Sequence, residues 1–379
     1  VALIRMRKTR PDLPRPFRVP LVPWIPMLSI AIMLVLAIEL FELSPIAWVA
    51  TTLWLLLGLL VYSQHGAADE AAKLEDTILL EQTVASREYS VLLPVANEAT
   101  ARRLADLATL FAMPHDGELF ALNVISVPRQ IGVSDGRAFL RQSRPILEEV
   151  ISVGQEHDIP VRTMLRLGRD VGDSIISAAR ARKADLMLLG WPGYTYSKGQ
   201  AFGTIIDLMS KNPPCDLAVV HLRKSGLPGR ILVPVAGGPN TRLALELALT
   251  EAEAIEQRTG TLPEVIALNI MPNGSDGNKL EQRRLDLLRD LWIDVWPIEL
   301  RIVASDDGCQ AILDEASEFE QIIIGASEEG LLEQSLFGSI PQRVAEEALS
   351  TVIMAKRHDP VKYGVRQWLI RRTRKGRQI

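Results

Sequence analysis

The stretch Leu186-Met187-Leu188-Leu189-Gly190-Trp191-Pro192-Gly193, separated by nine residues from Gly203-Thr204, decides the fold of this chain. A short run that is apolar throughout is typical of a strand buried on both faces of a parallel sheet. Glycines after such a strand indicate a turn, and a helical pattern begins at Gly203. Strand, glycine loop and helix in this order predict one unit of an α/β domain.

The chain repeats this pattern. Internal similarity at a nearly constant spacing indicates two copies of one domain in tandem. The recurring pairs are Leu92–Asn97 with Leu232–Gly237, Ala121–Ile125 with Ala267–Met271, Leu188–Gly190 with Ile323–Gly325, and Gly203-Thr204 with Gly338-Ser339. We therefore expect a first domain over residues 88–222 and a second over 229–357.

Apolar runs alternate with helical patterns in both copies, which predicts an α/β fold of two tandem, doubly wound parallel sheets. In the first copy the expected strands are Ser90–Val95, Leu119–Ser126, Val161–Leu167, Asp185–Gly190 and Asp216–His221. Its expected helices are Ala99–Ala112, Ser134–Gln155, Gly172–Arg182 and Gly203–Asn212. The second copy is expected to run strand Ile231–Val235, helix Arg242–Gln257, strand Glu264–Met271, helix Lys279–Asp294, strand Glu299–Ala304, helix Gly308–Glu318, strand Gln321–Gly325, helix Ser339–Leu349 and strand Val352–Lys356.

The glycine loop of the first copy is the candidate binding site. Gly190, Gly193 and Gly203 permit positive φ and a close approach of backbone to a ligand. The helix that begins at Thr204 offers free N–H groups, and the hydroxyl of Thr204 can donate to a phosphate or cap the helix. The same spacing also fits a plain strand–turn–helix connection whose glycines serve only turn geometry.

The spacing G-x2-G-x9-G-[ST], set in this strand order, resembles the ATP-binding pattern of universal stress proteins. The resemblance covers residues 88–222 and, more weakly, 229–357. It implies that Gly190, Gly193, Gly203 and Thr204 bind the phosphates of ATP or a related nucleotide. Family members that bind nucleotide usually carry aspartate at the end of the first strand, where this chain has Ala96 and Ala236. Another nucleotide, or none, therefore stays open.

The second copy departs further from the pattern. Gly325, Gly338 and Ser339 remain, but Glu328 stands where the second glycine is expected, and Glu329 and Glu333 follow. The negative charges of these three carboxylates would repel a phosphate in the loop. We interpret this copy as a degenerate second site with a structural role, since the fold commonly pairs two-fold. The chain then forms either an intrachain pseudo-dimer or a homodimer.

Two long apolar runs precede the repeat. Residues 21–40 carry one charge, Glu39, and residues 45–62 carry none. A membrane helix needs about 20 apolar residues, so residues 21–62 are predicted to form a transmembrane hairpin. Six basic residues lie in the Pro/Arg-rich segment 1–20, which places that segment and everything after Tyr62 in the cytoplasm. We expect a multi-pass protein of the inner (plasma) membrane with cytoplasmic C-terminal domains.

The string Arg5–Pro20, with Arg10-Pro11-Asp12-Leu13-Pro14-Arg15-Pro16-Phe17-Arg18 at its centre, resembles a loop of known transporters. It is similar to the loop before the last two membrane helices of permeases of the amino acid–polyamine–organocation superfamily. The resemblance covers residues 5–62 and implies a C-terminal fragment of an amino-acid permease, with the remainder of the permease as its partner.

The remaining segments and the composition narrow the function further. Residues 63–87 are expected to form a polar linker with some helical character over Asp69–Leu80. The tail, residues 358–379, carries basic and aromatic residues that suit anionic membrane lipid or simply remain solvated. A net charge of −4 argues against nucleic acid as a partner. Two cysteines and five scattered histidines provide no metal site.

We therefore expect regulatory, nucleotide-binding domains on a transporter fragment. The alternative is a membrane-tethered nucleotide-binding stress module without transport. An ATP-hydrolysing enzyme is disfavoured, because no Walker lysine–serine pair follows the glycines and no catalytic residue or metal ligand can be assigned.

Overall fold

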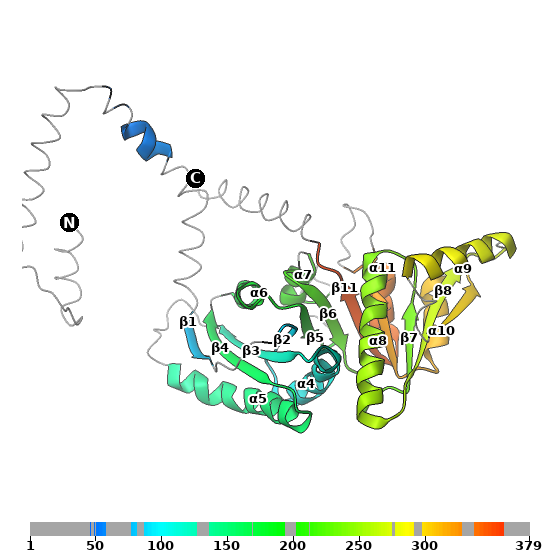
Figure 1. The fold of residues 1–379 in the computed structure, drawn as a ribbon, viewed down its shortest axis with the longest axis horizontal. Coiled ribbons are helices and arrows are strands. Elements are labelled where there is room, and N and C mark those ends of the chain that lie inside the picture. The colour runs from blue at the N-terminus through cyan, green and yellow to red at the C-terminus, as the bar shows by residue number, and fades with distance from the viewer. Residues whose placement is uncertain are drawn as a thin grey trace, which may run out of the picture. The chain divides into compact units, whose positions relative to one another are not determined.

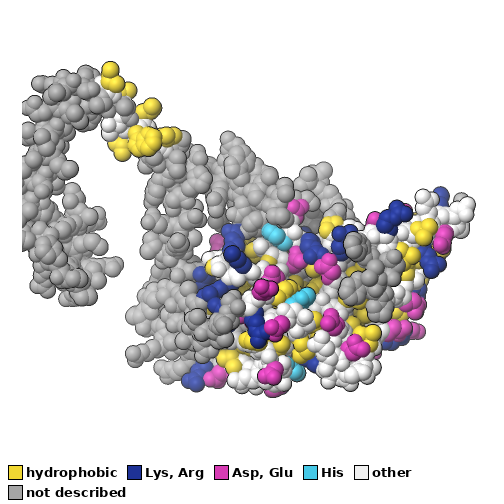
Figure 2. All heavy atoms as spheres, in the orientation of Figure 1, with side chains coloured by type: hydrophobic (Ala, Val, Ile, Leu, Met, Phe, Trp, Pro, Cys, Tyr) yellow, Lys and Arg dark blue, Asp and Glu magenta, His cyan; other side chains and the backbone are white. Residues whose placement is uncertain are grey.

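The computed structural model describes residues 46, 49, 51–57, 77–81, 87–126, 136–168, 170–193, 202–211, 213–274, 277–291, 298–327 and 337–359. The chain divides into two compact units, Val1–Leu74 and Glu75–Ile379. In the first unit residues 51–57 are helical and their side chains are exposed and mostly hydrophobic (Figure 2). No helix within the described ranges is long and apolar enough to cross a membrane. The predicted hairpin, residues 21–62, lies almost wholly outside those ranges.

The second unit contains both copies, in which strands and helices alternate (Figure 1). The first copy consists of β2 (Ser90–Pro94), α4 (Glu98–Ala112), a 3-10 turn η1 (Met113–His115), β3 (Glu118–Ser126), α5 (Gly136–Glu156), β4 (Val161–Gly168), α6 (Val171–Arg182), β5 (Leu186–Gly190), α7 (Thr204–Lys211) and β6 (Asp216–His221). The second consists of β7 (Arg230–Pro234), α8 (Pro239–Thr259), β8 (Glu264–Met271), α9 (Gly277–Leu291), β9 (Ile298–Ala304), α10 (Gly308–Ala316), β10 (Gln321–Gly325), α11 (Ser339–Glu347) and β11 (Thr351–Lys356). These bounds confirm the predicted α/β fold and the two copies.

The strands form one eleven-stranded sheet in the order β1-β4-β3-β2-β5-β6-β11-β10-β7-β8-β9. Within each copy the described strand pairs are parallel, apart from β1. Helices α4, α5, α8 and α9 cover one face, and α6, α7, α10 and α11 cover the other. Because both faces are covered, strands β2, β5 and β10 contain continuous apolar runs, Val91–Leu93, Leu186–Leu189 and Ile322–Ile324.

The two copies join through their last strands. β6 pairs antiparallel with β11, and Val219 lies opposite Met354 near the middle of the pairing. Each of these strands is the edge strand of its own copy and pairs with the edge strand of the other copy. The apolar core therefore extends across the junction on both faces of the sheet. The copies thus form a pseudo-dimer within one chain.

On the face seen in Figure 2, acidic and basic side chains are interspersed.

The predicted linker contains a strand. Thr77–Glu81 forms β1 and pairs antiparallel with β4, so the expected helical character is wrong for residues 77–80. The composition of residues 69–80 favours helix, but β4 is the outermost parallel strand of the first copy and offers unpaired N–H and C=O groups. Pairing with that edge outweighs the weak local preference for helix.

Candidate functional site

The glycine loop begins where β5 ends, at the carboxyl edge of the sheet. Gly190 is exposed, and Gly193 and Gly203 have φ of +86° and +96°. A Cβ at Gly203 would meet no atom within 4 Å, so this glycine serves backbone conformation, not packing. Thr204 is the first residue of α7. The structure therefore places all four predicted residues at one edge of the sheet, with positive φ at Gly193 and Gly203. Residues 194–201, including Lys198, lie outside the described ranges.

One donor of the loop is already occupied. The backbone N–H of Phe202 donates to Oδ1 of Asp207 at 3.1 Å, and Asp207 is 8% exposed in the first turn of α7. Asp207 lies three residues after Thr204, beyond the glycine pattern, so that pattern gave no indication of this carboxylate. A phosphate at this helix would have to use the N–H groups that follow Phe202, with a negative charge in the same turn.

Aromatic side chains pack together at the two ends of the loop. Trp191 is 4% exposed, and its ring centroid lies 4.9 Å from Phe202 and 4.8 Å from His221. Phe202 in turn makes an edge-to-face contact with Phe337 at 5.4 Å. Phe337 precedes Gly338 just as Phe202 precedes Gly203, so the equivalent residues of the two copies meet at the junction.

His221 joins the loop to the second copy. Its Nδ1 lies 2.8 Å from the backbone oxygen of Ala345 in α11, and because a carbonyl only accepts, Nδ1 carries the proton. Burial lowers the pKa of His221, which favours the neutral ring. A Cβ placed on Gly193 would lie 2.5 Å from Nε2 of the ring. Gly193 is therefore required for packing against His221, a reason that the sequence pattern alone did not reveal.

The corresponding strand ends of the second copy contact other parts of the chain. Gly325 is in direct contact with the first turn of α8, because a Cβ there would lie 2.6–2.7 Å from backbone atoms of Asn240 and Thr241. Asn240 donates to the backbone oxygen of Ala326 at 2.8 Å. Arg283 reaches from α9 to the backbone oxygen of Ala236 at 2.6 Å, at the end of the first strand. In the first copy Gly190 instead faces the flexible end of the Leu104 side chain.

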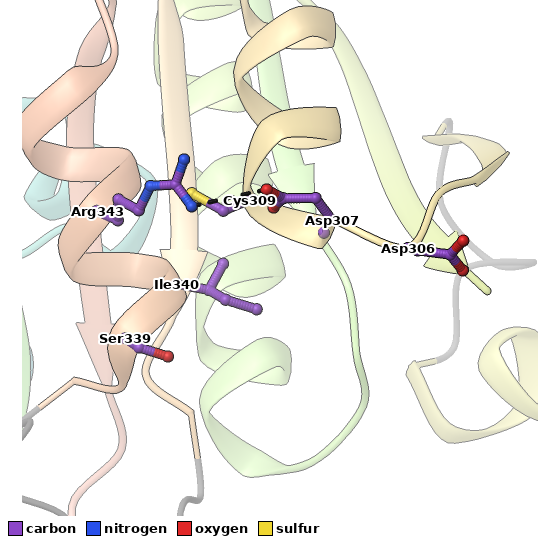
Figure 3. A pocket seen from close by; sticks show the side chains of 7 residues that line it. Asp306, Asp307, Cys309, Ser339, Ile340 and Arg343 are labelled. Atoms are coloured by element: carbon purple, nitrogen blue, oxygen red, sulfur yellow. Dashed lines mark ion pairs between the residues drawn. The ribbon is translucent and has the colours of Figure 1, made fainter. Parts of the chain in front are cut away.

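A cavity of about 310 Å³ lies beside the second loop (Figure 3). It opens between the first turns of α10 and α11 and is lined by Asp306, Asp307, Gly308, Cys309, Ser339, Ile340 and Arg343. Across the cavity, Nη1 of Arg343 lies 3.8 Å from Oδ2 of Asp307. Burial raises the pKa of the Cys309 thiol, which keeps it protonated and unreactive near neutral pH. Of the predicted second-site residues only Ser339 lines this cavity, and Gly338 is in contact with Ser327. Glu328, Glu329 and Glu333 lie outside the described ranges.

No group of three histidine, cysteine or acidic side chains within the described ranges could hold a metal ion. The two copies thus differ at this edge: Gly190 of the first copy lies beside Leu104, whereas the second copy has the contacts of Asn240 with Ala326 and of Arg283 with Ala236.

Comparison with known proteins gives two families. The model of the universal stress protein family matches residues 89–221 and 228–356. The model described as the C-terminus of AA_permease matches residues 17–69. The chain therefore contains a permease C-terminal segment followed by tandem universal stress domains.

Individual relatives are distant. The Na(+)/H(+) antiporter NhaS5 of Synechocystis is 21% identical over 272 residues, which are 70% of this chain but only 38% of the antiporter. A universal stress protein of Mycobacterium tuberculosis is 23% identical over 66% of this chain and 84% of its own length. A crystal structure of a universal stress protein from Archaeoglobus fulgidus aligns with 72% of this chain and 98% of its own, at 18% identity and a TM-score of 0.52. Other universal stress proteins have been solved in complex with dAMP and with cAMP.

Proposed function

This chain belongs to the universal stress protein family, and on that premise we propose that its paired copies are the cytoplasmic regulatory part of an amino-acid transporter. The observation that carries the proposal is that the permease C-terminal match and the tandem domains belong to one covalent chain. A relative named as a Na(+)/H(+) antiporter supports the pairing of this family's domains with transport.

The regulatory signal in this proposal is a nucleotide bound by the first copy. The positive φ of Gly193 and Gly203 supports this, as do the contacts of Asn240 and Arg283 in the second copy and the nucleotide complexes of other family members. ATP or a related nucleotide would place its phosphates at Gly193, Gly203 and Thr204. The second copy then acts as the structural partner.

The contacts at the two ends of the loop offer a route by which occupancy could affect the second copy. Trp191 follows Gly190 and contacts His221, and Phe202 precedes Gly203 and contacts Phe337. His221 is in turn hydrogen-bonded to α11 of the second copy. A shift of the loop on binding would therefore change contacts at the junction between the copies.

The experiment is uptake of labelled amino acids by the complete transporter polypeptide that carries this chain, reconstituted in vesicles. One preparation is intact and a matched one ends after Tyr62. We expect both to transport, and we expect only the intact one to respond when the internal ATP:ADP ratio is changed. Equal responses would contradict a regulatory role, and an absence of transport by both would favour a membrane-tethered stress module.

A further inference from the structure

The two ends of the sheet differ. In the first copy β4 is covered by β1, and seven of its eight residues are buried. β9 is the corresponding strand of the second copy, and among the described residues it pairs with β8 alone. No residue of β9 is buried, and Glu299 and Ala304 are exposed. Figure 1 shows this copy at the end of the sheet opposite β1. One edge of the sheet therefore carries an added strand, and the other offers a place for one.

The hydrogen bond just after β9 shows which of its backbone N–H and C=O groups face β8. The N–H of Ser305 donates to the oxygen of Met271 in β8 at 2.7 Å. Neighbouring residues of a strand point their N–H and C=O groups to opposite sides. The N–H and C=O groups of Ile298, Leu300 and Ile302 therefore point away from β8, where an incoming strand can bond with them.

The side chains of β9 are complementary to those of a second β9 strand that runs in the opposite direction. An antiparallel pairing of two β9 strands centred on Leu300 places Glu299 opposite Arg301 twice, and Ile298 opposite Ile302 twice. Glu299 and Arg301 share the face of α10, where Arg301 also binds Glu315 at 2.9 Å. Opposite charges directly across two antiparallel strands stabilise the pair, and like charges destabilise it.

We propose that β9 is the contact through which two copies of this chain associate, by antiparallel pairing about a two-fold axis through Leu300. A two-fold contact requires a surface that is complementary to itself, and the order Ile298-Glu299-Leu300-Arg301-Ile302 has this property. An unrelated partner strand would not need that symmetry. The added strand would extend each sheet as β1 extends β4.

The contact is small. A stable interface buries about 800 Å² per partner, and a strand of seven residues covers less than that. The association therefore depends on a high local concentration, such as confinement in a membrane provides. A covalent trap is the suitable measurement, because it records a weak contact.

The experiment uses the full chain reconstituted in lipid vesicles, with Leu300→Cys and a mild oxidant. In the proposed pairing the two Leu300 Cα atoms lie about 5.5 Å apart, within the range of a disulfide. We expect a covalent dimer. Leu285→Cys is the matched control, because this leucine is 52% exposed on α9 of the same copy. Equal yields from the two variants would overturn the proposal.

Charge reversal supplies the second arm, in the Leu300→Cys background. Glu299→Arg and Arg301→Glu should each lower the dimer yield by about ten-fold, because each creates two like-charge pairs. Mixing the two variants should restore the yield as a mixed dimer, since an all-basic strand then faces an all-acidic one. Glu347→Arg on α11 is the control for reversing an exposed ion pair, and it should change nothing.

The mixing step separates the proposal from damage to the strand, because a misfolded variant is not rescued by another. Failure of the mixture to form dimers would overturn the proposal. Slow hydrogen exchange at Leu300 in a dilute, monomeric sample would also overturn it, because a segment of the same chain would then cover the edge.

Discussion

Gly193 combines two requirements in one residue. Its φ of +86° favours glycine, and the ring of His221 leaves no room for a Cβ. Any substitution there disturbs both the loop and the contact between His221 and the second copy. The charge of the new side chain and its bulk must therefore be tested separately.

We predict that the chain binds one nucleotide, in the first copy, and that Gly193→Glu abolishes binding. The carboxylate adds repulsion of phosphate to the clash with His221. Gly193→Ala is the control for backbone strain and bulk, since it adds a Cβ without a charge. Calorimetry with ATP, ADP and cyclic dinucleotides measures nucleotide binding by each variant. A stoichiometry of two, or unchanged binding by Gly193→Glu, would show that the site lies elsewhere.

Glu251 is a buried carboxyl group outside the site. It is 0% exposed in α8 and accepts a hydrogen bond from Gln321, and its Oε1 has no partner. Burial raises its pKa to about 8. Between its ordinary pKa of about 4.3 and this value, the folded chain holds a proton that the unfolded chain has released. The free energy of unfolding therefore falls as pH rises through this window.

Glu251→Gln should remove that dependence, because a neutral amide of the same shape keeps the contact with Gln321. Between pH 5 and pH 8.5 we expect the wild type to lose roughly 2–5 kcal/mol more stability than this variant. Urea unfolding at both pH values is the measurement. Glu253→Gln, exposed on the same helix, is the control. Parallel pH curves for wild type and Glu251→Gln would contradict the assignment.

At the scale of elements, β1 is the clearest case of a segment defined by its partner. Thr77–Glu81 becomes a strand because the edge of β4 is there to pair with it. A fragment that begins at Glu88, as the linker prediction suggests, would leave this edge bare. The compact unit begins instead at Glu75.

We predict that residues 75–359 fold as a soluble α/β unit and that residues 88–359 fold with an exposed β4. Hydrogen exchange at the outward N–H groups within residues 164–167 should be at least about ten-fold slower in the longer fragment, because β1 pairs with these residues. Exchange within β2 serves as the internal control and should not differ. Equal exchange in β4 would mean that β1 does not pair in solution.

At the scale of the whole molecule, the antiparallel pairing of β6 with β11 makes two domains one sheet. Further contacts hold the same junction: Arg357, just after β11, binds Asp216 of the first copy at 3.0 Å and Glu246 of α8. The two copies should therefore unfold together.

The membrane topology is the remaining prediction at this scale. Basic residues before residue 21 predict that residues 21–62 enter from the cytoplasm and return to it. A membrane-impermeant thiol reagent added outside intact cells should modify Leu43→Cys and not Ala68→Cys. Permeabilised cells, in which both react, are the control. Modification of both in intact cells would exclude two spans followed by cytoplasmic domains.

The amino-acid sequence was enough to predict the α/β fold, the two copies and the position of the glycine loop. These depend on local patterns: continuous apolar strands such as Leu186–Leu189, helical periods between them, and glycines at fixed spacing. Three-dimensional contacts were needed to show why Gly193 must be glycine, that Asn240 and Arg283 bind backbone oxygens of Ala326 and Ala236, that Thr77–Glu81 is a strand, and that β9 pairs with β8 alone among the described residues. Each of these depends on residues far apart in the chain, and spacing along a sequence carries no record of which distant atoms come into contact.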